Sequence, residues 1–238
     1  MHYDEQANIQ SITQNLAERF SDVLHILNGT AMYDTFRTYQ LGDMKTCVPF
    51  NEAMCAHQTD AVIFSEAFIQ TRANGHGVST ANYRKTTIEP LQSLFEQTYA
   101  YVVLWFGADM FCQMNMLTML AYLEKRYNLD QIQIQVIDEE TYQTETIKPK
   151  KLDFRAIYDK VLMQGRAPTQ QTMPVLDQGI QLYLHYIQEN NDIIDYILKF
   201  RDLPQNMLLE QLFRTFSNYG LGDVQYLDMM KTVLSKDI

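Results

Sequence analysis

The apolar positions in the first part of the chain form short continuous runs, and stretches of helical period separate these runs. The runs cover residues 23–27, 45–50, 101–106 and 131–137, and their lengths are typical of strands. In residues 5–20, apolar side chains instead recur every three or four positions. Strands that alternate with helices predict parallel pairing through right-handed crossovers. We therefore expect an α/β fold with a small, mostly parallel sheet of about four strands flanked by helices.

Two of the predicted strands differ in polarity. Residues 101–106 (YVVLWF) are apolar throughout, which predicts a strand buried on both faces, with Trp105 in the core. Residues 131–137 (QIQIQVI) alternate between polar and apolar, which predicts a half-exposed strand at a sheet edge.

Residues that favour helix ends divide the segments between the strands. Thr59, Ser79 and Asp109 are predicted N-caps, of helices over about 60–73, 79–97 and 109–127. Pro90 lies inside the second of these helices and should kink or split it.

The chain changes character after about residue 140. Residues 141–150 are polar and rich in lysine towards their end, which predicts a linker. It would separate an α/β domain over 1–140 from an all-helical domain over 151–238. The helical periods beyond the linker cover residues 151–163, 174–189, 191–200, 205–217 and 222–235.

Composition and charge exclude several classes of function. The chain has 238 residues and a formal net charge of −10, which repels nucleic-acid backbones and anionic membranes. Residues 209–231 have the outline of a helix-turn-helix, but two aspartates precede the first lysine of the second helix, so we interpret them as a packing hairpin. We expect no nucleic-acid partner and no membrane partner. The N-terminus lacks the pattern of a signal peptide, and three cysteines without CxxC spacing fit reduced thiols, so a cytoplasmic location is expected.

The candidate site follows from the topology. In an open parallel sheet, ligands bind outside the carboxyl ends of the strands. Turns after three predicted strands should meet there, and two of them lead into helices whose free N–H groups favour anions. We therefore expect a small anionic ligand, held by Asn28, Gly29, Thr30, Asn51, Glu52, Asp109 and Gln113.

Each of these residues also has a purely structural interpretation. Asn28 and Gly29 form a turn in any case, and Asp109 can serve only as an N-cap. Glu52 and Asp109 can form an acid–base pair or share a divalent cation such as Mg²⁺, although the sequence requires no cofactor. Cys55 and His57 are too close in sequence for the usual spacing of zinc ligands. His76, in the loop 74–77, can belong to a lid or to a helix-ending turn, and we favour the turn.

Several short motifs are similar to those of a known bacterial family. They are HI-NG at residues 25–29, NEAMC at 51–55, SE-FI-TR at 65–72 and LWFG-DMFCQ at 104–113. Together they resemble the bacterial domain-of-unknown-function family 1835 over about residues 23–137, and residues 151–238 resemble its helical companion region. The chain departs from the family pattern after Cys55, where Ala-His-Gln replaces the expected Gly-Pro. The resemblance implies a fold and no activity.

Two functions are compatible with these observations. The first is a module that binds or hydrolyses a small phosphorylated or nucleotide-like ligand at the carboxyl edge of the sheet. The second is a non-catalytic interaction or regulatory protein whose C-terminal helices contact a protein partner or a second copy of the chain. The many tyrosines of those helices favour a protein partner.

Overall fold

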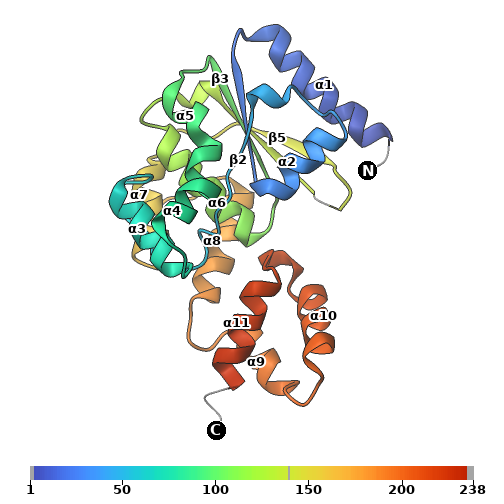
Figure 1. Ribbon diagram of the computed structural model, residues 1–238, viewed down its shortest axis with the longest axis vertical. Coiled ribbons are helices and arrows are strands. Elements are labelled where there is room, and N and C mark those ends of the chain that lie inside the picture. The colour runs from blue at the N-terminus through green and yellow to red at the C-terminus, as the bar shows by residue number, and fades with distance from the viewer. Residues whose placement is uncertain (1–2, 139, 235–238) are drawn as a thin grey trace.

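A single five-stranded sheet forms the centre of the molecule. The computed structural model describes residues 3–138 and 140–234 (Figure 1). The strands are ordered β2-β1-β3-β4-β5, and all neighbours are parallel except β4 and β5. The predicted α/β fold with a mostly parallel sheet is confirmed. The strand bounds are β1 (Val23–Leu27), β2 (Cys47–Pro49), β3 (Tyr101–Phe106), β4 (Ile132–Ile137) and β5 (Thr144–Ile147).

Helices cover both faces of this sheet. One face packs on α1 and α2, and the other packs on α3 to α8. Their bounds are α1 (Tyr3–Arg19), α2 (Gly29–Thr38), α3 (Glu66–Gly75), α4 (Thr80–Tyr83), α5 (Gln92–Glu96), α6 (Met110–Leu123), α7 (Phe154–Tyr158) and α8 (Pro174–Tyr186). Three further helices, α9 (Asp192–Lys199), α10 (Gln205–Thr215) and α11 (Asp223–Leu234), form a group at the end of the molecule away from α1 (Figure 1).

The central strand β3 is buried on both faces, as predicted. Leu104 and Phe106 point into the larger core, whereas Val103 and Trp105 point into the core under α1 and α2. Trp105 has no exposed surface, and its indole Nε1–H donates to Nδ1 of His25 at 3.0 Å. Burial lowers the pKa of His25 to about 4, which keeps the imidazole neutral and able to accept this bond.

The prediction that residues 131–137 form a half-exposed edge strand is wrong. β4 is an inner strand between β3 and β5, and Gln133 and Gln135 are buried. Their amides are satisfied, because Gln133 accepts from the hydroxyl of Tyr101 and Gln135 bonds the hydroxyl of Thr146. The pattern misled because the polar side chains face hydrogen-bonding partners instead of water.

Part of the range predicted as a linker is a strand of the sheet. Residues 144–147, inside the predicted 141–150 segment, form β5 and pair antiparallel with β4. Beyond it, α7 and α8 contribute Phe154, Tyr158 and Leu176 to the same core as the sheet. The chain therefore ends in helices, as predicted, but its first helices after residue 151 are part of the layer that covers the sheet.

The predicted caps are only partly correct. Ser79 and Asp109 accept hydrogen bonds from the backbone N–H groups of Asn82 and Cys112, as N-caps do. Thr59 does not cap a helix, since α3 starts at Glu66 behind Ser65, and the Thr59 hydroxyl bonds that of Tyr158. The segment 80–96 is split into α4, a π turn, a 3-10 turn that holds Pro90, and α5. Within the described part of the chain, no helix has the length and apolarity needed to span a bilayer.

Candidate functional site

The turns after the parallel strands meet at one edge of the sheet. Leu27 is in register with Pro49 on one side and with Trp105 on the other, so the chain leaves β1, β2 and β3 at the same edge. The predicted gathering of Gly29, Asn51 and Gly107 at this edge is therefore confirmed. The order β2-β1-β3 places the reversal of strand order between β1 and β3, where open α/β sheets usually bind ligands.

Side chains of α6 fill this reversal point. The amide of Asn28 donates to Sγ of Cys112 at 2.9 Å, and its oxygen accepts from Asn115 at 3.0 Å. Asn115 also donates to the carbonyl of Glu52 and accepts from the backbone N–H of Met54. Asn28 accordingly makes no side-chain cap on α2. These contacts give Asn28 a structural role, because they join the turn after β1 to α6 and, through Asn115, to the turn after β2.

Thr30 and Asn51 form a pair on the exposed rim of the same edge. The Thr30 hydroxyl donates to Oδ1 of Asn51 at 2.8 Å, and the Asn51 amide donates to the carbonyl of Thr86. Gly29 has a φ of +80°, which explains the glycine at the start of α2. These residues connect β1 and β2 to the segment after α4, and they do not line the same opening as Asp109.

Glu52 is completely buried in a charged cluster. Its carboxylate accepts five hydrogen bonds: from the backbone N–H of Ala53, from Nε and Nη2 of Arg72, from Nε2 of His76 and from the hydroxyl of Tyr83. The hydrogen bond from His76 and the charge of Arg72 outweigh desolvation and hold the pKa of Glu52 well below its usual range. Glu52 is therefore permanently ionised and fully occupied, so it is not available as an acid or base.

Arg72 was not predicted as a site residue, although the motif at 65–72 contains it. Besides Glu52, its guanidinium donates to the carbonyls of Ala53, Ala56 and Gln58. It therefore fixes the whole loop after β2. Removing one member of such a buried pair typically costs about 3–5 kcal/mol, because an uncompensated charge remains.

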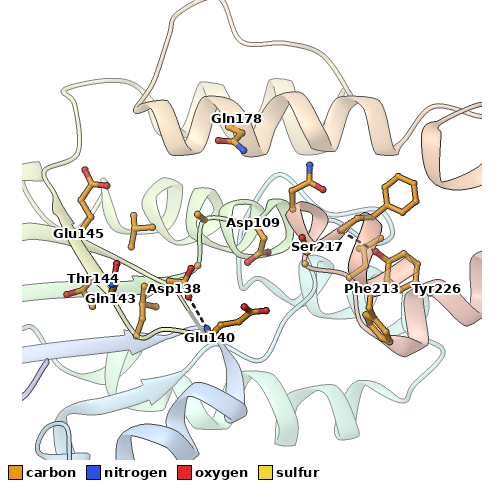
Figure 2. A pocket seen from close by; sticks show the side chains of 18 residues that line it. Asp109, Asp138, Glu140, Gln143, Thr144, Glu145, Gln178, Phe213, Ser217 and Tyr226 are labelled. Atoms are coloured by element: carbon orange, nitrogen blue, oxygen red, sulfur yellow. Dashed lines mark hydrogen bonds between the residues drawn. The ribbon is translucent and has the colours of Figure 1, made fainter. Parts of the chain in front are cut away.

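A large opening at the sheet edge lies one strand further along, at the ends of β3 and β4. We call this opening, of about 890 Å³, the edge cavity. Its sheet side carries four carboxylates, and its helical side carries aromatic and small polar residues (Figure 2). The lining residues are Gly107, Ala108, Asp109, Val136, Ile137, Asp138, Glu140, Gln143, Thr144, Glu145, Gln178, Phe213, Phe216, Ser217, Asn218, Gly220, Leu221 and Tyr226.

Asp109 is the predicted site residue that lies in the edge cavity with its side chain exposed to it. Its Oδ1 accepts from the backbone N–H of Cys112 at 2.9 Å, so it caps α6. Its Oδ2 has no hydrogen-bond partner among the residues that the structure describes. A side chain at Gly107 would come within 2.7 Å of this oxygen, so the glycine keeps the space beside it open. Asp109 thus combines a cap with a free acceptor.

Asp138 is a second fixed carboxylate of the edge cavity. It follows β4, and its Oδ1 accepts from the N–H groups of Glu140 and Thr141 and from the Thr141 hydroxyl. The bonds from Thr141 lower the pKa of Asp138 below its usual value, so the group stays ionised. The alternation of polar and apolar residues in β4 does not predict Asp138 as a site residue. Its position directly after the end of a strand could have done so.

Gln113 lies behind the cavity wall instead of lining it. It is fully buried, and its amide donates to the carbonyl of Gly107 at 2.6 Å. Its own oxygen has no hydrogen-bond partner within the described part of the chain, and its side chain packs directly against Gly179 of α8. The expectation that Gln113 shares a ligand with Asp109 is therefore not supported by the lining of the cavity.

The charged residues that line the edge cavity are all acidic among those that the structure describes. Asp109, Asp138, Glu140 and Glu145 contribute four carboxylates, and none of its described lining residues is Lys, Arg or His. Across residues 3–138 and 140–234, no group of three or more His, Cys, Asp or Glu side chains is arranged to hold a metal ion. The carboxylates are thus spread along the cavity and do not converge on one point.

Comparison with known proteins adds no identity. No protein-family model, no curated protein and no solved structure matches the chain. The resemblance to family 1835 therefore stays a prediction.

Proposed function

We propose that this protein binds a small organic cation in the edge cavity. The observation that carries the proposal is the lining charge: four carboxylates without a basic side chain among the described lining residues. Such a cavity has a negative potential that concentrates cations and repels anions. The anionic ligand expected from the helix N-termini would meet this potential directly, so the charge of the cavity favours the opposite ligand class.

The other wall of the cavity suits the apolar body of such a cation. Phe213 is 40% exposed although it is a large apolar residue, and its ring meets that of Tyr226 edge to face at 5.4 Å. In Figure 2, Phe213 and Tyr226 lie at one end of the edge cavity and Glu145 at the other, with Asp109 between them. Aromatic faces attract ammonium groups by about 0.5–2 kcal/mol. An elongated amine could therefore use both ends.

A nucleotide-like ligand would need a counter-ion in this cavity. Its phosphates would approach Asp138 and Glu140 only with a bound cation between them. The two ligand classes thus differ in their requirement for Mg²⁺, and a binding experiment can separate them.

The test is isothermal titration of the purified protein with spermidine and putrescine, and in parallel with ATP in the presence and absence of Mg²⁺. We expect binding of the amines that weakens with salt and no binding of ATP alone. Glu140→Gln should weaken amine binding, whereas Glu189→Gln removes the same charge from an exposed position outside the cavity and should not. Equal affinity in both variants, or binding of ATP without Mg²⁺, would overturn the proposal.

An interaction surface on the C-terminal helices is the second candidate. Large apolar side chains are exposed on α9, α10 and α11, namely Leu198, Met207, Phe213 and Val224. Exposed apolar groups of this kind occur at protein interfaces. Sedimentation equilibrium over a range of concentrations tests a homodimer, and a Val224→Asp variant should shift the equilibrium towards monomer if these helices associate.

A further inference from the structure

A second large cavity lies on the other side of the contact between the sheet layer and the C-terminal helices. It has a volume of about 960 Å³, and we call it the histidine cavity. The segment after β2 contributes His57, the end of α3 contributes His76, and α11 contributes Asp228 and Lys231. Its charged groups therefore differ from those of the edge cavity, where the described lining is acidic only.

The ring of His76 is held in one orientation by the buried cluster. Its Nε2 lies 2.7 Å from Oε1 of Glu52, whose carboxylate is ionised and can only accept hydrogen bonds. Nη2 of Arg72 also lies 3.2 Å from this Nε2, and Nδ1 is the nitrogen without a hydrogen-bond partner among the described residues. Arg72, Ala53 and Tyr83 hold Glu52 in place from the other sides. This arrangement fixes the direction of an imidazole that is still 26% exposed.

His57 is brought to His76 by an unfavourable backbone conformation. Its φ is +63°, in the left-handed region that costs a residue with a Cβ about 1 kcal/mol or more. A side chain at Gly75 would come within 2.6 Å of the Cβ of His57, so only glycine permits this approach. The two imidazole rings then meet edge to face with their centres 5.0 Å apart.

Lys231 adds a third positive group to the same cavity. Its ammonium group makes no hydrogen bond or ion pair with any residue that the structure describes, and Asp228 supplies the one carboxylate among the described lining. With both histidines protonated, the lining carries three positive groups and one negative group. With both neutral, its net charge is zero.

We propose that the histidine cavity is an anion site that takes a phosphate-type oxyanion, free or as a phosphate monoester. Lys231 and the protonated rings of His57 and His76 are the donors, and His76 donates through Nδ1; charge-assisted hydrogen bonds to such oxygens are the stronger kind. Glu52 is a positioning residue, because it directs the His76 ring without touching the ligand. The histidine cavity and the edge cavity share no lining residue, so this proposal does not depend on the function proposed above.

The experiment follows the histidine C2–H signals of the full chain by NMR during titration with sodium sulfate and with sodium phosphate. Sulfate keeps its charge between pH 5.5 and 8, so its affinity reports the protein groups alone. We expect the signals of His57 and His76 to move, and sulfate affinity to fall at least tenfold as the pH rises across this range, because a neutral imidazole offers the oxyanion one N–H group fewer than a protonated one. His185 serves as the internal control, since its Nε2 also bonds a carboxylate, Asp192 Oδ1, at 2.7 Å, but its side chain does not line the histidine cavity.

Variants decide whether the binding is specific. Lys231→Gln and His76→Gln should each weaken sulfate binding at least fivefold, Asp228→Asn should strengthen it, and His185→Gln should leave it unchanged. Lys231 is exposed, so its replacement should not impair folding. The proposal is overturned if the His185 signal moves as much as those of His57 and His76, or if Lys231→Gln and His185→Gln bind sulfate equally.

Discussion

The carboxylate of Asp109 lies directly against Gly220, so that a Cβ built on Gly220 would overlap Oδ1 of Asp109. Asp109 belongs to the sheet edge, and Gly220 belongs to the turn between α10 and α11. This contact joins the two parts of the molecule at the edge cavity, which both residues line. The closure of the cavity therefore depends on a glycine in the C-terminal helices.

Gly220→Ala should destabilise the protein and disturb the edge cavity. Gly220 has a φ of +65°, so alanine there costs about 1 kcal/mol from the backbone alone, and the overlap with Asp109 adds to this. Gly77→Ala is the matched control, because its φ is +66° and nothing lies within 4 Å of a Cβ at that position. Urea denaturation should show a larger loss for Gly220→Ala than for Gly77→Ala. If both variants lose the same free energy of unfolding, the contact with Asp109 does not contribute to stability.

The single tryptophan should report a rigid, dry core. Trp105 is fully buried, and Phe36 packs edge-on to its ring at 5.1 Å. We expect blue-shifted fluorescence that iodide does not quench, and a loss of about 3–5 kcal/mol in Trp105→Ala. Trp105→Phe should cost less, but it leaves Nδ1 of His25 without its donor. Free quenching of the native fluorescence would contradict the buried position.

Stability should fall as the pH drops from about 6.5 towards 4, because of His25. Burial lowers its pKa from 6.5 to about 4, so the unfolded chain binds a proton in this range that the folded protein does not. The contribution is therefore complete above pH 6.5 and decreases as the pH falls, by about 3 kcal/mol in total. Denaturation at a series of pH values measures it.

His25→Asn provides the control for this pH dependence. Asparagine has no titrating group, and its oxygen is an acceptor that Trp105 needs. The variant should lose most of the slope between pH 6.5 and 4.5. An unchanged slope would assign the effect to other groups, of which His57 is one, since burial also lowers its pKa.

The sequence predicted the positions of the strands better than the burial of their side chains. The apolar run 101–106 identified β3 and its burial, and the turns after β1, β2 and β3 were placed at one edge correctly, because parallel pairing alone determines this. The Gln residues of β4 misled, since periodicity reports polarity and cannot show that Thr146 of a later strand would satisfy them. β5 itself was missed, because TETI carries too little apolar character to be distinguished from a polar connection.

The candidate site was predictable in part for the same reason. Asp109 was found because a residue after a buried strand and a glycine faces the sheet edge whatever the rest of the fold. Glu52 was predicted as a ligand-binding residue, but its carboxylate is occupied by Arg72, His76 and Tyr83. These partners come from α3, the end of α3 and α4, which the sequence does not place relative to β2. The acidic character of the cavity was missed, because Asp138 and Glu145 lie in and beside a segment interpreted as a linker.

Substitution can separate two roles of Asp109, the cap of α6 and a contact with a ligand in the edge cavity. As an N-cap it accepts from the N–H of Cys112 with Oδ1, and asparagine can replace it in this bond with little loss, because Asn and Asp cap about equally well. Asp109→Asn should therefore change the melting temperature little, whereas Asp109→Ala should cost about 1 kcal/mol. If Oδ2 contacts a bound cation in the edge cavity, however, Asp109→Asn should abolish most of the stabilisation that spermidine confers. Glu189→Gln, with the same loss of charge far from the cavity lining, should keep that stabilisation. Thermal melts with and without spermidine separate the two roles, and an undiminished spermidine effect in Asp109→Asn would leave Asp109 with its cap alone.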